Sequence, residues 1–182
     1  LLAKERFGTT DIYNGDSMEL IFCMIVGYLI GSLSPAALIS KLKKRNLREH
    51  GTGNLGATNI MLNFGKTYGV LVMLFDIAKG FVAVRFALLI SPALPFAGLI
   101  AGTCAVVGHV FPFYLKFKGG KGLAAFGGMI LGVDPKLFLA LLLLTVVLMI
   151  LVNYSVAMPM SAGILFPLLY GLRTRSFSGL FL

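Results

Sequence analysis

Repeated apolar runs are the feature of this sequence that most constrains its fold. The first, Leu20 to Ser40, is about as long as a helix must be to cross the hydrocarbon core of a bilayer. Four more follow it: Tyr68 to Ile90, Phe96 to Val110, Leu137 to Val152 and Val156 to Leu172. With 58% hydrophobic and 13% charged residues over 182 positions, the chain is too apolar for a soluble domain. We therefore expect an all-α integral membrane protein, a polytopic helical bundle with five full spans.

A sixth apolar segment, from Gly122 to Val133, is too short for an ordinary span and ends at Asp134-Pro135. It predicts a half-length or tilted helix packed inside the bundle. Residues 1–17 are polar, and we expect this N-terminal extension to lie outside the fold. Residues 18–182 then form a single transmembrane domain, which we expect to be truncated at its C-terminus because it stops shortly after a new apolar segment begins.

The charge distribution predicts an orientation in the membrane. The net charge is +9, from 16 Lys and Arg against 7 Asp and Glu, and five of the bases directly follow the first apolar run: Lys41, Lys43, Lys44, Arg45 and Arg48. The positive-inside rule places this segment in the cytoplasm. Attraction to lipid headgroups explains any one of these lysines at least as well as substrate binding does. Nucleic-acid binding is disfavoured, because the bases lie beside apolar runs and not along one polar face.

Two glycine-containing loops carry the chemistry expected of phosphate binding. The first, Gly51 to Asn59, reads Gly-Thr-Gly-Asn-Leu-Gly-Ala-Thr-Asn, and its glycines allow backbone N–H groups to converge on one anion. An ordinary glycine-rich turn is the equal alternative for this composition alone. The second, Lys116 to Gly122, combines a closely approachable backbone with mobile ammonium groups. It does not have the spacing of a Walker A loop.

Charged residues also occur inside the apolar runs. Asp76 and Lys79 are one helical turn apart, and charges at membrane depth are costly unless they are paired or face a cavity. We expect the two to pair or to face the bundle interior, with a purely structural ion pair as the alternative. His109 ends the third run beside the second loop, with no carboxylate near it along the chain. A lone histidine there is more often structural than catalytic, so His109 is a second-tier candidate.

Three stretches together resemble a known family. They are the first loop, Asp76-Ile77-Ala78-Lys79-Gly80, and Gly-His-Val-Phe-Pro-Phe-Tyr-Leu-Lys-Phe-Lys-Gly-Gly-Lys-Gly from Gly108 to Gly122. In order and spacing they are similar to the signatures of the bacterial acyl-phosphate-dependent glycerol-3-phosphate acyltransferases. The resemblance implies a multi-pass, seven-helix enzyme of the bacterial inner membrane, with its active site facing the cytoplasm. It would transfer a fatty acyl group from acyl phosphate to the 1-hydroxyl of glycerol 3-phosphate. The product, lysophosphatidic acid, begins phospholipid synthesis.

The resemblance also assigns roles to individual residues. The residues expected to bind acyl phosphate are Thr52, Gly53, Asn54, Leu55, Gly56, Ala57, Thr58 and Asn59. Lys121 is the first candidate for binding glycerol phosphate and Lys118 is the second. The supporting residues are Asp76, Lys79, Gly119 and Gly120. No protein base is assigned, and we expect the leaving phosphate to accept the hydroxyl proton. No metal or cofactor is expected.

The sequence departs from the family pattern in ways that keep two alternatives open. Leu62 stands where many members carry an arginine thought to bind glycerol phosphate, and we expect the family's seventh helix, with its His and Asn contacts, to be missing. One alternative is a diverged relative that binds acyl phosphate but uses another acceptor or none. The other is a membrane transporter for an anion, because intramembrane charges also mark transport paths. The sequence does not indicate the oligomeric state.

Overall fold

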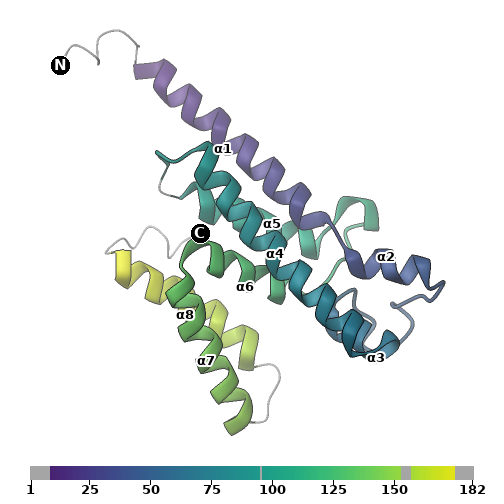
Figure 1. Ribbon diagram of the computed structural model, residues 1–182. Helices are drawn as coiled ribbons and strands as arrows, with labels where there is room; N and C mark the ends of the chain where they lie inside the picture. Colours follow the sequence, from purple (N-terminus) through teal and green to yellow (C-terminus); the bar gives the residue numbers. More distant parts are fainter. Residues whose placement is uncertain (1–8, 95, 153–156, 175–182) are drawn as a thin grey trace. The chain divides into compact units, whose positions relative to one another are not determined.

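The computed structural model describes residues 9–94, 96–152 and 157–174, and all regular elements in these ranges are helical (Figure 1). The elements are α1 Thr9–Ser32, α2 Pro35–Leu42, α3 Ala57–Phe64, α4 Lys66–Ile90, α5 Ala97–Val110, the short 3₁₀ helix η1 Phe113–Leu115, α6 Leu123–Val133, α7 Pro135–Val152 and α8 Ala157–Thr174. The all-α prediction is therefore confirmed. The chain forms two compact units, Leu1–Met129 and Ile130–Leu182, which are described separately.

Helices α1, α4 and α5 lie side by side in the first unit (Figure 1). Glycines allow the close approach of α1 to α5. A Cβ atom at Gly27 would fall 2.4 Å from the carbonyl oxygen of Ala101, and one at Gly31 would fall 2.0 Å from that of Ala105. Small residues at such contacts let helix backbones meet directly, which is a common way for helices to associate in membranes.

The first apolar run was expected to be one continuous helix, but the structure divides it into two helices. Helix α1 ends at Ser32 and α2 begins at Pro35. Proline has no N–H to donate and disfavours helical geometry in the residue before it. Ser34 accordingly takes an extended conformation, and its hydroxyl oxygen accepts a hydrogen bond of 3.2 Å from the Ala37 N–H as an N-cap. At its other end α1 begins at Thr9, so the helix extends into the polar segment expected to lie outside the fold.

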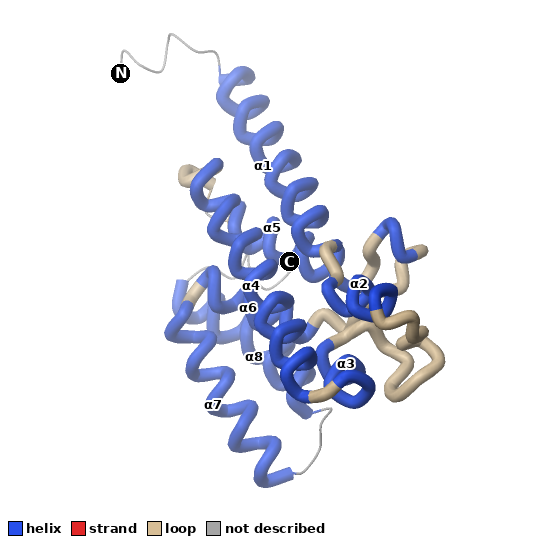
Figure 2. The backbone as a smooth tube through the Cα atoms, turned by 45° about the vertical axis from the view of Figure 1, so that its right-hand side comes forward, coloured by secondary structure: helices blue, strands red, loops and turns tan. Residues whose placement is uncertain are grey.

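Apart from the turn between α4 and α5, the loops of the first unit gather with α2 and α3 at one end of it (Figure 2). Helix α3 was not predicted, and it begins inside the first glycine loop. A small apolar core holds this end together; its buried residues are Ala36, Leu47, Leu55, Ile60 and Val72. Burying a side chain such as Leu47 or Ile60 contributes about 1.5–3 kcal/mol to stability. Leu115 of η1 packs against the same core, so both loops are attached to it.

The remaining helices of both units follow the predicted segments closely. Helices α4, α5 and α6 match the second run, the third run and the half-length segment. In the second unit, α7 and α8 match the last two runs, and Pro167 lies inside α8. Arg173 forms an ion pair with Asp134 within this unit. The turn expected at Asn153-Tyr154-Ser155 lies outside the described residues.

The helix surfaces suit a membrane environment. Two helical stretches of the described chain are long and apolar enough to cross a bilayer, Ser17–Leu42 and Ala97–Leu115. Helix α4 is as long but carries charges at Lys66, Asp76, Lys79 and Arg85. Large apolar side chains are exposed along α1 and α4, among them Ile21, Phe22, Ile25, Leu29, Leu71 and Leu74. Apolar surface of this extent marks an interaction surface, and a bilayer would cover it.

Candidate functional site

The structure brings the two glycine loops into contact. A Cβ atom at Gly120, in the second loop, would fall 2.8 Å from the carbonyl oxygen of Leu55 in the first. Arg48 connects the same segments from the other side, because its Nη2 donates to the carbonyl oxygens of Leu115 and Lys118. Residues almost 70 positions apart in the chain are thus neighbours in one polar site.

Asn59 determines the shape of the first loop. Its side chain is 1% exposed, and its Nδ2 donates to the carbonyl oxygens of Leu47, at 2.7 Å, and Asn54, at 2.9 Å. Its Oδ1 accepts from the backbone N–H of Thr52, at 2.9 Å, and from Nδ2 of Asn63, at 3.0 Å. These bonds occupy the amide group, so Asn59 positions the loop, and its side chain is not available to an acyl phosphate.

Glycine conformations complete this loop. Gly51 and Gly53 have φ of 63° and 69°, in the left-handed region that glycine enters without strain. At Gly51 the space is restricted as well, because a Cβ atom there would fall 2.2 Å from Oδ1 of Asn59. The loop then ends at Gly56, which precedes α3 in an extended conformation and without a side-chain cap.

The N-terminus of α3 therefore presents backbone donors. The first N–H groups of a helix have no intrahelical partner, and together with the helix dipole they favour an anion. In α3 these groups belong to Ala57, Thr58 and Asn59, three residues predicted to bind acyl phosphate. Of the other predicted residues, Thr52 and Gly53 are exposed, Asn54 and Gly56 are half-buried, and Leu55 is buried in the apolar core.

The second loop folds back on the C-terminal end of α5. The Gly119 N–H donates to the carbonyl oxygen of Val110, at 2.8 Å, and the Gly120 N–H to that of His109, at 3.1 Å. A Cβ atom at Gly119 would lie 2.0 Å from the carbonyl oxygen of His109, so a larger residue would not fit. The side chains of Lys118 and Lys121 remain exposed on either side of this close contact.

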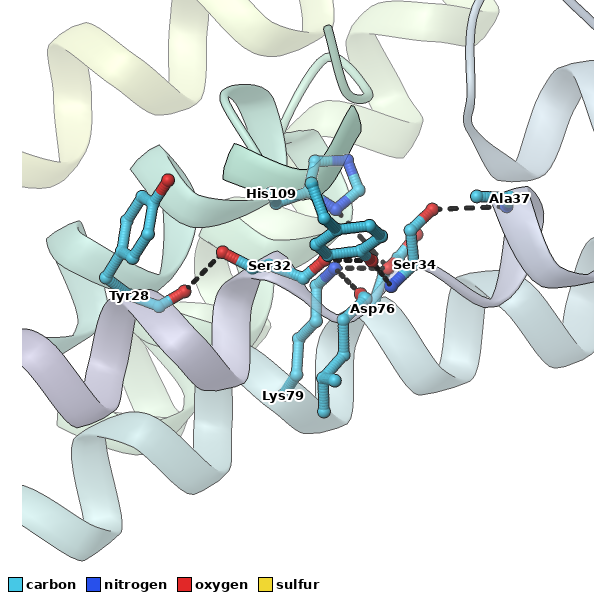
Figure 3. Close-up of polar contacts among 9 residues, drawn as sticks. Tyr28, Ser32, Ser34, Ala37, Asp76, Lys79 and His109 are labelled. Atoms are coloured by element: carbon cyan, nitrogen blue, oxygen red, sulfur yellow. Dashed lines mark hydrogen bonds and ion pairs between the residues drawn. The ribbon is translucent and has the colours of Figure 1, made fainter. Parts of the chain in front are cut away.

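A buried polar cluster lies directly beneath the loops (Figure 3). Nζ of Lys79 lies 2.8 Å from Oδ1 of Asp76, which shows the predicted pairing, and Nδ1 of His109 lies 3.3 Å from the same oxygen. The three residues are only 4%, 3% and 7% exposed. The contacts of Asp76 Oδ1 and His109 Nδ1 have ion-pair distances without the geometry of hydrogen bonds. The opposite charges of Lys79 and Asp76 attract each other within the cluster.

The sequence analysis named Asp76 but missed its position beside His109. Asp76 is far from His109 along the chain, yet both are at similar separations from the turn that joins α4 to α5. In an antiparallel pair of helices, such residues lie opposite each other. The antiparallel arrangement of α4 and α5 therefore predicts that Asp76 and His109 are neighbours. Inspection of the sequence around His109 alone does not reveal this.

The cluster also stabilises the break between α1 and α2. Nζ of Lys79 donates to the carbonyl oxygen of Leu33, at 2.8 Å. The hydroxyl of Tyr114 donates to the carbonyl oxygen of Ser32, at 2.6 Å, and accepts from the Ser34 N–H, at 3.1 Å. Backbone groups released from a helix inside a bundle need such partners. The break and the charged cluster are therefore parts of one connected structure (Figure 3). The second loop adjoins it where Gly120 lies against His109.

Comparison with protein families identifies relatives along most of the chain. The model of a family described as glycerol-3-phosphate acyltransferase matches residues 21–182. The glycerol-3-phosphate acyltransferase of Exiguobacterium sibiricum is 44% identical over 127 residues, covering 69% of this chain and 61% of the relative. That of Macrococcus caseolyticus is 40% identical over 123 residues, covering 67% and 62%. The chain thus spans about three fifths of the length of these relatives.

Solved structures show the same fold. The crystal structure of PlsY, an integral membrane glycerol 3-phosphate acyltransferase, in its glycerol 3-phosphate form is 34% identical with a TM-score of 0.76 and covers 84% of this chain and 78% of that one. Its lysophosphatidic acid form is 35% identical with a TM-score of 0.65, covering 71% and 64%. The fold of this chain is that of an integral membrane protein. By the extent of the family match and the identity to these relatives, the chain belongs to the glycerol-3-phosphate acyltransferase family.

Proposed function

We propose that this chain transfers a fatty acyl group from acyl phosphate to the 1-hydroxyl of glycerol 3-phosphate, giving lysophosphatidic acid in phospholipid synthesis. The contact of the two glycine loops at Gly120 and Leu55 is the observation that carries the proposal. Two phosphate-bearing substrates must meet in this reaction, and the two loops supply adjacent places for two phosphates. The family's shared name gives the same acceptor and the same type of reaction.

The first loop would hold the acyl phosphate. The backbone N–H groups of Ala57, Thr58 and Asn59 lie at the N-terminus of α3, where a phosphate is stabilised by both hydrogen bonds and the helix dipole. These donors would also stabilise the negative charge that develops on the phosphate as the anhydride breaks. The apolar surfaces of α1 and α4 offer the acyl chain a place in the membrane.

The second loop would hold glycerol 3-phosphate. Lys121, as first candidate, and Lys118, as second, supply mobile ammonium groups. They flank the backbone of Gly119 and Gly120, which lies close to His109 and Leu55. Holding the acceptor next to the acyl phosphate converts a collision between two molecules into a reaction within one complex, which accelerates it strongly.

The chemical step needs no protein base. The 1-hydroxyl oxygen attacks the acyl carbon, a new C–O ester bond forms, and the C–O bond to the phosphate breaks. The hydroxyl proton passes to the departing phosphate. His109 is then a supporting residue, because its Nδ1 faces Asp76 while its Nε2 lies against Gly120, where a Cβ atom would fall 2.1 Å away.

The proposed location is the bacterial inner membrane with both loops facing the cytoplasm. The bases that follow the first apolar run support this orientation by the positive-inside rule. Soluble glycerol 3-phosphate would reach the loops directly from that side.

A second candidate is a diverged relative that binds acyl phosphate without acylating glycerol 3-phosphate. Leu62 favours it, because this side chain is 66% exposed on α3 and has no charge with which to bind the acceptor's phosphate. In that case the first loop would still function, and the acyl phosphate would be bound or hydrolysed without ester formation.

The test is an assay of the purified protein with radiolabelled palmitoyl phosphate and glycerol 3-phosphate. Formation of labelled lysophosphatidic acid that is lost in Lys121→Ala and retained in Lys66→Ala supports the proposal; Lys66 is an exposed lysine at the start of α4. Hydrolysis without ester formation supports the diverged relative. Transport of label across liposome membranes without any product would show an anion transporter and overturn both.

A further inference from the structure

A basic cavity lies beside the two loops, at the end of α2. Its volume is about 420 Å³, and four cationic residues line it, Lys41, Lys44, Arg45 and Arg48. Leu55 of the first loop and Leu115 of η1 form part of its wall, but Lys121 does not contribute. The cavity is therefore adjacent to the loops and distinct from the phosphate positions proposed there.

The positive charge of this cavity is not neutralised by the protein. The lining has no carboxylate, and none of the ion pairs in the described residues includes its four cations. Glu49 is the one acid between residues 20 and 75 of the sequence, and its Oε1 accepts a hydrogen bond from Asn46 Nδ2 at 2.5 Å. Like charges held around one cavity repel each other, and a bound anion removes this repulsion.

Arg48 is held in place before any ligand binds. Its Nη2 is fixed by the carbonyl oxygens of Leu115 and Lys118. A guanidinium group has five N–H donors, so this anchoring leaves others to face an anion. Because the side chain is already ordered, it loses less conformational entropy when a ligand binds.

The backbone between α2 and the first loop is also fixed. The Arg45 N–H donates to the carbonyl oxygen of Ser40, at 3.1 Å, and the Ser40 hydroxyl donates to that of Arg45, at 2.6 Å. Lys44 within this turn has φ of 50°, a left-handed conformation that a lysine rarely adopts. Lys43, by contrast, is directed elsewhere, with its ammonium 5.3 Å from the centre of the Tyr68 ring. Lys44 and Arg45 of this turn therefore line the cavity, whereas Lys43 does not.

We propose that this cavity is a further binding site for a phosphate-bearing anion, formed by Lys41, Lys44, Arg45 and Arg48. Phosphate suits these donors because its oxygens accept from both a guanidinium fork and ammonium groups. The cavity is wide open to solvent, and its volume of about 420 Å³ accommodates a phosphate headgroup. Two sources supply this chemistry, the headgroup of an anionic phospholipid and free phosphate in solution.

The experiment compares two double variants that remove equal charge. Lys44→Gln/Arg45→Gln removes two cations of the cavity, whereas Lys43→Gln/Lys66→Gln removes two exposed cations outside it. Arg48 is left unchanged because it also joins the loops. In one arm, inorganic phosphate is titrated into the full chain in neutral detergent and followed by calorimetry. In the other, spin-labelled phosphatidylglycerol is titrated into phosphatidylcholine nanodiscs that contain the protein.

We expect saturable binding that is weakened about tenfold or more in the cavity variant, since each base near a membrane surface contributes about 1 kcal/mol. In the control variant, the affinity should change less than about twofold. Saturation by inorganic phosphate identifies the free anion as ligand, and saturation by phosphatidylglycerol alone identifies the lipid headgroup. Equal weakening in both variants would show a diffuse charge effect and overturn the proposal. Absence of saturable binding in both arms would overturn it too. These readouts do not depend on acyl transfer, so they stand or fall separately from the proposed function.

Discussion

Nδ1 of His109 lies 3.3 Å from Oδ1 of Asp76, which joins the C-terminal end of α5 to the middle of α4. The opposite edge of the same imidazole contacts Gly120, so a buried carboxylate is linked through one side chain to the loop proposed to hold glycerol 3-phosphate. Lys79 extends the connection to Leu33 at the break between α1 and α2.

Asp76→Asn should destabilise the protein strongly. The change leaves the Lys79 ammonium buried without its carboxylate, and removing one partner of a buried ion pair costs about 3–5 kcal/mol. The measurement is thermal unfolding in detergent. The double variant Asp76→Asn/Lys79→Met should be less destabilised than the single one, because no unpaired charge then remains. A double variant as unstable as the single one would show that the charge pair is not the cause.

Gly120→Ala should weaken glycerol 3-phosphate binding with little effect on unfolding. Its Cβ atom would fall 2.1 Å from His109 Nε2 and 2.8 Å from the Leu55 carbonyl oxygen, so the two loops must separate. We expect KM for glycerol 3-phosphate to rise at least about tenfold, because even small displacements of binding groups are costly. Gly163→Ala is the control, since nothing lies within 4 Å of a Cβ atom there. Unchanged kinetics in Gly120→Ala would contradict the role assigned to this contact.

The sequence was sufficient to predict helices wherever an apolar run lies between polar or breaking residues. Helix α4 agrees with the second run because Gly65 precedes it and the Ser91-Pro92 turn follows it. Helix α5 agrees with the third run because it ends just before Phe111 and a proline. The break inside the first apolar run was not predicted, for the opposite reason. Hydropathy is continuous there, and the break depends on Pro35, Ser34 and partners supplied by Tyr114 and Lys79.

The two loops could be identified from the sequence, but their internal contacts could not. Glycines and lysines indicated two phosphate-binding loops, and the structure places these loops together. The direction of Asn59 was not predictable, because it depends on the positive φ of Gly51 and Gly53 and on carbonyl groups that the folded loop turns inward. The proximity of Asp76 to His109 depends on how α4 and α5 align, which is a tertiary property.

Asn59→Asp should loosen the first loop although it preserves the size of the side chain. One acceptor for the Thr52 N–H is kept, but the donors to the carbonyl oxygens of Leu47 and Asn54 are lost, and a carboxylate oxygen would face these carbonyls. Each buried acceptor left without a donor costs about 1–3 kcal/mol. Hydrogen exchange of residues 47–63 should accelerate, while α5 stays protected. Uniform acceleration throughout the chain would point to global unfolding instead.

Tyr114→Phe should release the break between α1 and α2. The change removes one hydroxyl that donates to the Ser32 carbonyl oxygen and accepts from the Ser34 N–H. Two ordinary hydrogen bonds contribute about 1–3 kcal/mol together. The amide of Ser34 should exchange faster by the corresponding factor, measured in detergent by mass spectrometry of peptides. Tyr68→Phe is the matched control, because its ring contact with Lys43 is retained. Equal effects in the two variants would argue against a specific role for Tyr114.

Leu62→Arg should improve the use of glycerol 3-phosphate. Leu62 is 66% exposed near the C-terminal end of α3, where a cation is favoured by the helix dipole and can be added without disturbing the core. A guanidinium group there would add a charged partner for the acceptor's phosphate, and such a contact contributes about 1.5–3 kcal/mol, or roughly tenfold or more in KM. The KM for acyl phosphate should change little, since the donors proposed to hold it are at the other end of α3. Thr67→Arg, an exposed position at the start of α4, controls for the added charge. If both arginines lowered KM equally, general electrostatic attraction would account for the gain, and if neither did, Leu62 would not limit acceptor binding.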